Sequence, residues 1–272
     1  MPARPPSRLS RRAALLGLGA ATLSCRSGSQ ASTQSHPAPS AAVWSEPWGG
    51  LAIAQVTEMR EDERGGTALV LLHGFGARGD DLAPLAKSLL RSGVRCILPA
   101  APLSLGDGGR AWWQIDASDR PRYVIDEPGP ATLSTLPNLQ LEVARSAVSG
   151  VLRTVRERYA PNALFLLGFS QGAMLSLDLA LAGSERLDRV VVLSGALLVD
   201  SAAHLPAERS TRPAVFISHG RQDPRLPFAG AERMKAELEQ HGFAVRFRPF
   251  EGGHAIPRST VAEVSQFLFE AG

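Results

Sequence analysis

The chain has 272 residues, of which 44% are hydrophobic and 20% are charged. This composition is that of an ordinary globular protein with a large core, and one domain of about 230 residues is more economical than two small ones. The formal net charge is +3, but four arginines lie before Cys25 and no acidic residue precedes Glu46, so the chain after Ser24 carries a net charge of −1. The excess of basic residues therefore belongs to an N-terminal segment. The charge of the rest of the chain does not indicate a nucleic-acid partner, and we expect none.

Residues 1–25 have the pattern of an export signal. The pair Arg11-Arg12 is followed by a run of apolar and small residues, 13–24. This run is too short to span a bilayer, which takes about 20 apolar residues, and it is typical of a signal peptide. The arginine pair resembles a bacterial twin-arginine signal, and a general secretory signal is the alternative. We therefore expect an exported protein, located in the periplasm, in the cell envelope or outside the cell.

Cys25 closes the apolar run, at the position of the lipidated cysteine in bacterial lipoproteins. Residues 22–25 match a lipobox loosely, and residues 26–43 are a polar linker rich in Ser, Pro and Ala, as in a flexible tether. This pattern favours a lipid anchor that holds the protein at a membrane through Cys25; ordinary signal cleavage nearby is the alternative. Cys96 is then the only cysteine of the folded domain, and its apolar neighbours favour a small core residue over a nucleophile.

Residues 44–272 alternate between short apolar runs and helical patterns. The apolar runs predict six strands, at 67–72, 94–98, 163–167, 190–193, 214–218 and 245–250. Apolar residues spaced three and four apart predict helices near 82–90, 138–159, 171–182, 229–241 and 260–270. We expect Asp80 or Asp81 to cap the first of these helices. Strands that alternate with helices predict an α/β domain whose sheet is mostly parallel, with helices on both faces.

Residues 101–136 have no clear period and are rich in Gly, Pro and Asp. A stretch of this length is usually functional or carries short elements of its own. In an α/β sheet it would overhang the carboxyl ends of the strands, where ligands bind. It contains Trp112 and Trp113, and two interpretations remain open. The tryptophans anchor the loop, or Trp113 lines a hydrophobic substrate-binding pocket for an acyl chain.

The sequence Gly-Phe-Ser-Gln-Gly at residues 168–172 is a G-x-S-x-G motif. It lies between an apolar strand and a helical pattern, which is the context of the sharp turn that presents a nucleophilic serine. Glycine at Gly168 and Gly172 removes the Cβ atoms that would collide in such a turn. The helix that follows places its positive end beside the serine. We therefore predict that Ser170 is the catalytic nucleophile.

A nucleophilic serine needs a base, and the base needs an acid that orients it. In α/β folds that present the serine at such a strand-to-helix turn, the chain order is serine, acid, histidine. His254 follows the last predicted strand in a glycine-rich loop and is the predicted base. Asp223 lies in a turn after another strand and is the predicted acid, with Asp200 as the alternative. Asp178, on the helix after the serine, points the wrong way, and we expect His219 to be structural.

The tetrahedral intermediate of acyl transfer also needs two backbone N–H groups, which form an oxyanion hole. The first is that of Gln171, the residue after the nucleophile. The second is expected in the loop 73–76, which follows a buried strand and precedes a helix, with Phe75 as the donor. Each such donor typically contributes about 3 kcal/mol of transition-state stabilisation.

Together these motifs resemble the phospholipase/carboxylesterase family, which includes acyl-protein thioesterases and small bacterial carboxylesterases. The similar stretches are LLHGFGARGDDL from Leu71, LPAAPLSLGDGGRAWWQID from Leu98, GFSQGAM from Gly168, HGRQDPRLPF from His219 and GGHAIP from Gly252. The resemblance implies an α/β-hydrolase fold with a small cap, and neither a metal nor a cofactor. It assigns the triad and the two oxyanion donors to Ser170, Asp223, His254, Phe75 and Gln171.

These observations predict a serine carboxylic-ester hydrolase that acts on small or medium acyl esters through an acyl-enzyme. A lysophospholipase or an acyl thioesterase is the alternative within enzymes. A surface-tethered binding protein on a hydrolase scaffold is an alternative from another class, because fold alone does not establish function. The presence of every triad and oxyanion element disfavours that last alternative.

Overall fold

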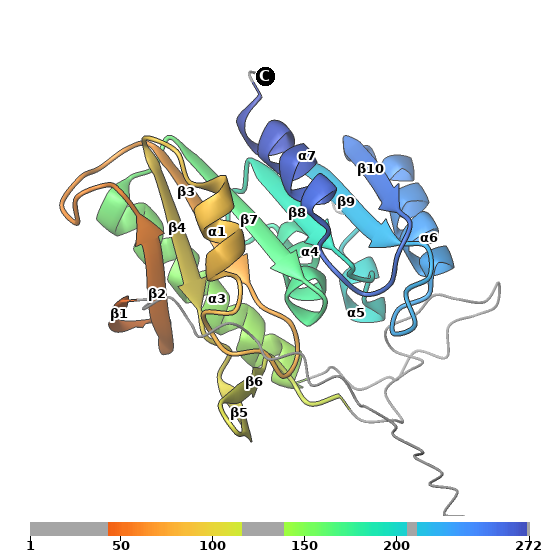
Figure 1. Ribbon diagram of the computed structural model, residues 1–272, viewed down its shortest axis with the longest axis horizontal. Coiled ribbons are helices and arrows are strands. Elements are labelled where there is room, and N and C mark those ends of the chain that lie inside the picture. Colours follow the sequence, from red (N-terminus) through yellow and green to blue (C-terminus); the bar gives the residue numbers. More distant parts are fainter. Residues whose placement is uncertain (1–42, 116–138, 206–210, 271–272) are drawn as a thin grey trace, which may run out of the picture. The chain divides into compact units, whose positions relative to one another are not determined.

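The computed structural model describes three stretches of the chain, residues 43–115, 139–205 and 211–270 (Figure 1). The predicted signal peptide, and all but the last residue of the predicted linker, lie outside the described residues. The described chain begins with a strand at Val43, one residue ahead of the predicted start of the domain. No helix in these three stretches is long and apolar enough to span a membrane.

The main sheet has eight strands in the order β1-β2-β4-β3-β7-β8-β9-β10, and β5 and β6 form a separate hairpin. The strands are β1 (Val43–Trp48), β2 (Leu51–Thr57), β3 (Thr67–Leu72), β4 (Val94–Pro99), β5 (Leu103–Gly106), β6 (Gly109–Ala111), β7 (Ala163–Phe169), β8 (Arg189–Leu193), β9 (Ala214–Gly220) and β10 (Val245–Phe250). The helices are α1 (Ala83–Leu89), α3 (Leu139–Tyr159), α4 (Gln171–Ala182), α5 (Val199–Ala202), α6 (Phe228–Gln240) and α7 (Arg258–Phe269).

Neighbouring strands from β4 to β10 are parallel, whereas β2 is antiparallel to both β1 and β4. The prediction of a mostly parallel α/β sheet is therefore confirmed, and all six predicted strands are present. Because parallel strands end at the same edge, the loops after β3, β7, β9 and β10 meet there. The β5–β6 hairpin also lies beyond this edge, in the direction in which the arrows of β4 and β7 point (Figure 1).

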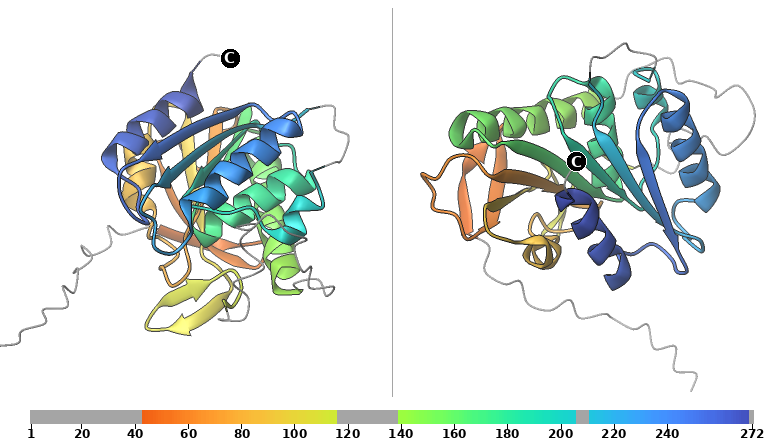
Figure 2. Two further views of the ribbon diagram at one scale, coloured as in Figure 1. Left: turned by 90° about the vertical axis from the view of Figure 1, so that its right-hand side faces the viewer. Right: turned by 90° about the horizontal axis from the view of Figure 1, so that it is seen from above.

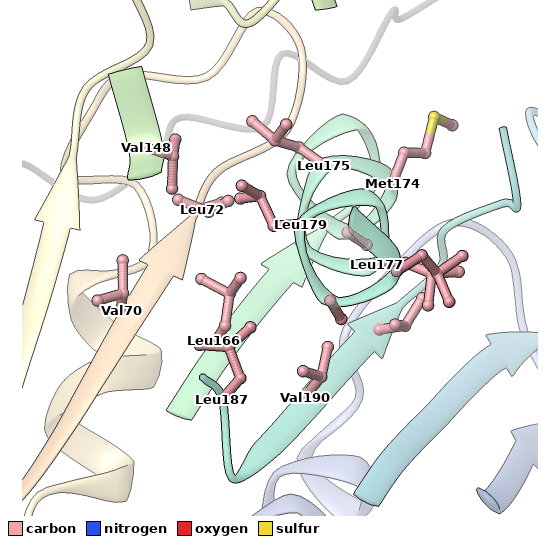
Figure 3. Close-up of a cluster of buried hydrophobic side chains, with 14 of the residues drawn as sticks. Val70, Leu72, Val148, Leu166, Met174, Leu175, Leu177, Leu179, Leu187 and Val190 are labelled. Atoms are coloured by element: carbon pink, nitrogen blue, oxygen red, sulfur yellow. The ribbon is translucent and has the colours of Figure 1, made fainter. Parts of the chain in front are cut away.

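Two hydrophobic cores lie on the two faces of the sheet, because alternate residues of a strand point to opposite sides. One face packs against α3, α4 and α6, and the other against α1 and α7 (Figure 2). Figure 3 shows the first core around α4, where Leu72 of β3 lies next to Leu179 of the helix and Leu166 of β7 lies below them. Every residue of α4 from Gln171 to Leu181 is buried.

The predicted cap of α1 is wrong. Neither Asp80 nor Asp81 is the N-cap residue; that position belongs to Leu82, which makes no side-chain cap hydrogen bond. The N–H of Ala83 instead donates to the backbone carbonyl of Asp80, at 2.9 Å. A backbone turn therefore does at this helix what a side-chain cap does elsewhere.

The aperiodic stretch from residue 101 contains the β5–β6 hairpin, which fits the expectation that a long loop carries short elements of its own. Its turn lies at Asp107 and Gly108, whose φ angles are +46° and +81°. Positive φ at both central residues is what a two-residue hairpin turn requires, and Asp-Gly is a preferred pair there. That dipeptide is the sequence signal for the hairpin.

Candidate active site

Ser170 lies at the sharp turn between β7 and α4. Its backbone has φ 54° and ψ −117°, a strained conformation for a residue with a side chain. A Cβ at Gly168 would lie 2.2 Å from the carbonyl oxygen of Gly172, and a Cβ at Gly172 would lie 2.1 Å from the carbonyl oxygen of Leu72 in β3. Both glycines are therefore required, since no side chain fits where the turn packs on itself and on β3.

The loops that carry Asp223 and His254 are joined by their backbones. The N–H of Arg221 donates to the carbonyl of Phe250 at 2.9 Å, and that of Gln222 donates to Gly252 at 2.9 Å. The contact is close enough that a Cβ at Gly220 would lie 2.2 Å from the Gly253 oxygen. This pairing extends the parallel register of β9 and β10 beyond the sheet, and it holds the acid and the base side by side.

His254 lies between the predicted nucleophile and the predicted acid. Its Nε2 is 2.9 Å from Ser170 Oγ, and its Nδ1 is 2.7 Å from Asp223 Oδ2. A carboxylate accepts from Nδ1–H, so Nε2 is left to accept the serine proton. The imidazole also packs against the ring of Phe169, with 5.0 Å between the ring centroids. The structure thus brings together the three residues that the motifs singled out, in the order that proton transfer requires.

Asp223 is held as a carboxylate. Its Oδ1 accepts the backbone N–H groups of Arg225 at 2.8 Å and Leu226 at 3.0 Å, while Oδ2 accepts from His254. Burial raises the pKa of Asp223, but the hydrogen bonds from Leu226, His254 and Arg225 favour the ionised form and bring the pKa below its ordinary value. A negative charge therefore faces the imidazole at neutral pH.

His219 is fully buried at the end of β9. Its Nε2 is 2.9 Å from the carbonyl oxygen of Leu226 and 3.4 Å from Asp223 Oδ2. Burial lowers the pKa of His219, so the ring is neutral and donates its Nε2–H toward these oxygens. The ring lies inside the turn that carries the acid and does not contact Ser170, which agrees with the expected structural role.

The loop after β3, which carries the second predicted donor, passes beside the nucleophile. A Cβ at Gly74 would lie 3.3 Å from the Cβ of Ser170, so this loop passes directly over the serine. The N–H of Gly76 donates to the carbonyl of Arg110 at 2.8 Å, and that of Ala77 donates to Gly74. The N–H of Phe75 has no partner among the described residues and stays available for an oxyanion. The side chain of Phe75 is 39% exposed.

His73, at the start of this loop, is buried and neutral. Its Nδ1 is 2.8 Å from the carbonyl of Gly74, and its Nε2 accepts the N–H of Ala101 at 3.0 Å. These partners place the proton on Nδ1. Desolvation by burial lowers the pKa of His73 to about 4, so the ring keeps this tautomer at neutral pH.

Trp112 and Trp113 follow β6, and each is 1% exposed. Both belong to the hydrophobic core on the side of α3 and α4, and the indole N–H of Trp112 donates to the carbonyl of His73 at 2.9 Å. This burial agrees with the interpretation that the pair anchors the loop. The contact of Trp113 with an acyl chain stays a prediction.

The remaining candidates occupy other positions in the fold. Asp178 is buried in contact with Arg145 and Ser201, so it does point away from the site, and Asp200 lies on the short helix α5. Cys96 is fully buried, and burial raises the pKa of its thiol to about 12, which confirms it as a core residue.

One feature of the site was not predicted: the side chain of Gln171 is itself buried and hydrogen-bonded to the backbone of Trp112 and Trp113, which we call the tryptophan loop. The sequence signal is weak, because a glutamine in the first turn of a helix is ordinary. Only the burial of α4 from Gln171 to Leu181 indicates that a polar side chain there must have partners inside the protein.

A nucleophile turn between strand and helix, followed along the chain by an acid turn and a histidine loop on a mostly parallel sheet, is the arrangement of the α/β-hydrolases. Residues 52–270 match the family model described as Phospholipase/Carboxylesterase. The chain therefore belongs to this family, which confirms the resemblance found in its motifs, and it is a serine hydrolase of the carboxylesterase and acyl thioesterase class.

Individual relatives are distant but cover most of the chain. Acyl-protein thioesterase 1 of Cryptococcus neoformans is 28% identical over 225 residues, which cover 75% of this chain and 91% of the relative. Carboxylesterase SOBER1 of Arabidopsis thaliana is 24% identical over 213 residues, covering 74% and 89%. Among solved structures, esterase PE8 superposes with a TM-score of 0.64 at 26% identity and covers 80% of this chain and 97% of its own.

Proposed function

We propose that this protein hydrolyses carboxylic esters with small or medium acyl groups, with Ser170 as nucleophile, His254 as base and Asp223 as the orienting acid. The observation that carries the proposal is the position of the imidazole, whose two nitrogens lie 2.9 Å from Ser170 Oγ and 2.7 Å from Asp223 Oδ2. Both distances are within the range of hydrogen bonds that transfer or hold a proton.

The reaction has two steps. In the first, His254 takes the hydroxyl proton of Ser170 while Oγ attacks the ester carbonyl, and the resulting oxyanion accepts the N–H groups of Phe75 and Gln171. The intermediate expels the alcohol, which receives the proton from His254, and an acyl-serine remains. In the second step, His254 takes a proton from water, the hydroxide attacks the acyl-serine, and Ser170 leaves as the protonated alcohol. Asp223 stabilises the imidazolium in both steps.

A thioester or a lysophospholipid is the second candidate substrate. The names of the relatives, an acyl-protein thioesterase and a carboxylesterase, support both an ester and a thioester. The same mechanism serves either, because the thiolate of a thioester is a better leaving group than an alkoxide. A panel of esters and thioesters matched in acyl chain would rank the two.

The first test is the hydrolysis of p-nitrophenyl butyrate by the wild type and by Ser170→Ala. We expect kcat to fall by at least about 10⁴-fold, because the nucleophile and its base act as a unit. Ser88→Ala, an exposed serine on α1, serves as control and should keep full activity. Labelling by a fluorophosphonate should occur in the wild type and not in Ser170→Ala. A wild type that is neither active nor labelled would support a binding protein instead.

The second test concerns acyl-chain length. If Trp113 lines the acyl pocket, Trp113→Ala should shift the preference of kcat/KM toward longer acyl chains. Trp48→Ala removes another buried indole far along the chain and controls for loss of core packing. The same chain-length profile in the wild type and in Trp113→Ala would leave Trp113 as an anchor of the loop only.

We further propose that the protein is exported and tethered to a membrane through Cys25. The support is the sequence: an arginine pair at Arg11-Arg12, a short apolar run and a polar linker after the cysteine. In a bacterial host, mass spectrometry should find a mature N-terminus at a diacylated Cys25, in the membrane fraction. Cys25→Ala should release the protein from that fraction. Wild-type protein with an intact Met1 in the cytosol would contradict the proposal.

A further inference from the structure

The side chain of Gln171 pairs with the backbone of the tryptophan loop. It is 1% exposed, its Oε1 accepts the N–H of Trp112 at 2.9 Å, and its Nε2 donates to the carbonyl of Trp113 at 2.8 Å. A primary amide that accepts and donates to successive residues imitates the edge of a neighbouring strand. The loop is thus attached to the first residue of α4, beside the nucleophile.

The same loop is attached to the other oxyanion segment. The carbonyl of Arg110 accepts the N–H of Gly76 at 2.8 Å, and the N–H of Arg110 donates to Ala77 at 3.0 Å. Two residues further on, the indole N–H of Trp112 donates to the carbonyl of His73 at 2.9 Å. Residues 110–113 therefore form a bridge, bonded on one side to the loop of Phe75 and on the other to Gln171.

This bridge lies between two donors that come from distant parts of the sequence. An oxyanion hole works only if both N–H groups reach the same oxygen, at about 2.7–3.1 Å from each. Errors of about 0.5 Å in such constellations reduce catalysis, so their spacing has to be fixed by buried hydrogen bonds around them. The β3–β7 pairing fixes where the two segments leave the sheet, and the bridge fixes them again beyond its edge.

We propose that the Gln171 side chain is a positioning residue of the oxyanion hole: through residues 110–113 it sets the distance between the N–H of Gln171 and the N–H of Phe75. Gln171 then contributes twice, with its backbone as a donor to the oxyanion and with its side chain as the tie that holds the second donor in place. This inference rests on the proposed acyl transfer at Ser170.

The proposal predicts a loss specific to the transition state. The oxyanion forms after the ester has bound, so a displaced donor lowers kcat and leaves KM nearly unchanged. A trifluoromethyl ketone, which adds to Ser170 and places an oxyanion in the hole, should lose affinity in proportion to kcat. A defect that only loosened the core would lower the melting temperature without this selectivity.

The test compares Gln171 variants with a matched control by steady-state kinetics, with active sites counted by fluorophosphonate titration. Gln171→Met keeps the length of the side chain and removes both hydrogen bonds. We expect its kcat to fall by about 10- to 100-fold, the size of effect that misplacement by about 1 Å produces. Ser176→Ala, one turn later on α4, removes a buried hydrogen bond to the Gly172 carbonyl and serves as the matched control with unchanged kcat.

Gln171→Glu adds a readout in pH. An ionised carboxylate cannot donate to the Trp113 carbonyl, whereas the protonated form restores both bonds. The ratio of its kcat to that of the wild type should therefore rise as the pH is lowered. Trp112→Phe, which removes the indole donor and keeps an aromatic ring, is the second probe if Gln171→Met does not fold, and its kcat should fall with KM unchanged.

Wild-type kcat and wild-type inhibitor affinity in Gln171→Met would overturn the positioning role and leave the proposed hydrolysis intact. A Gln171→Met variant whose kcat/KM falls only because KM rises, with kcat unchanged, would overturn it as well. Failure of the proposed function looks different, because the wild type would then neither turn over esters nor react with the fluorophosphonate.

Discussion

Asp178 and Asp223 are both buried carboxylates, but their partners differ. Asp178 accepts from the guanidinium of Arg145 through both oxygens, at 2.7 and 2.8 Å, and from the hydroxyl of Ser201 at 2.6 Å. Asp223 accepts from two backbone N–H groups and from one imidazole nitrogen of His254. The main partner of Asp178 is therefore a guanidinium, which is permanently charged, whereas the partners of Asp223 are backbone amides and an imidazole.

The difference separates a structural carboxylate from one that serves chemistry. Arg145 on α3, Asp178 on α4 and Ser201 on α5 tie three helices together. The hydrogen bond that Arg145 donates to Asp178 raises the pKa of Arg145, so this charge pair does not change with the reaction. Asp223 has no permanent counter-charge, so it attracts the positive charge that appears on His254 when the imidazole takes a proton. Burial alone does not identify a catalytic acid, whereas the kind of partner does.

The largest effect is expected at Asp223. Asp223→Asn keeps the shape of the side chain but removes the charge that stabilises the imidazolium and fixes the tautomer, so kcat should fall by about 10⁴-fold. The free energy of unfolding should change far less than activity does. Kinetics with p-nitrophenyl butyrate and urea unfolding measure the two quantities. A variant with a tenth or more of wild-type kcat would remove Asp223 from the triad.

Asp178→Asn should show the opposite pattern. Removing one charge of a buried pair leaves the guanidinium of Arg145 without its main partner, and such losses cost about 3–5 kcal/mol. We expect the free energy of unfolding in urea to fall by about that amount, while kcat per folded molecule stays close to the wild-type value. A large loss of kcat at wild-type stability would contradict the structural assignment of this carboxylate.

The comparison extends to buried groups that stay neutral because they lack a counter-charge. The pKa of His73 is lowered from 6.5 to about 4 by burial, so between these values the unfolded chain binds a proton that the folded one does not. The contribution of His73 to the free energy of unfolding is therefore complete above pH 6.5. It is lost as the pH falls toward 4, which lowers the free energy of unfolding by about 3 kcal/mol. Unfolding free energies measured across this range should fall less steeply in His73→Gln. Equal slopes would contradict the assignment.

The smallest effect is expected at Ser201, which donates to Asp178 while Arg145 keeps its place. Ser201→Ala removes one hydrogen bond to a charged group, which is worth about 2 kcal/mol. Urea unfolding should show this loss, and kcat should remain that of the wild type. A cost equal to that of Asp178→Asn would mean that Ser201 is as important to the cluster as the arginine.

The catalytic candidates were predictable because their geometry follows from chain order. Ser170, Asp223 and His254 each follow a strand, and parallel strands bring such residues to one edge whatever the rest of the sequence is. The pairs Arg145–Asp178 and Gln171–Trp112 were not predictable, since each joins segments whose approach depends on how helices and loops pack. The cap of α1 was mistaken because the N-cap residue is Leu82, and the N–H of Ala83 donates to a backbone carbonyl, which no residue type signals.

The burial of α4 from Gln171 to Leu181 has a consequence for how the protein opens. Local unfolding requires that a segment expose little apolar surface, and α4 is enclosed by β3, β7, β8, α3 and α5 with no face toward water. The amide hydrogens that are bonded within the helix can exchange with solvent only when most of the domain opens. The body of the helix that follows the nucleophile therefore belongs to the slowest-exchanging part of the molecule.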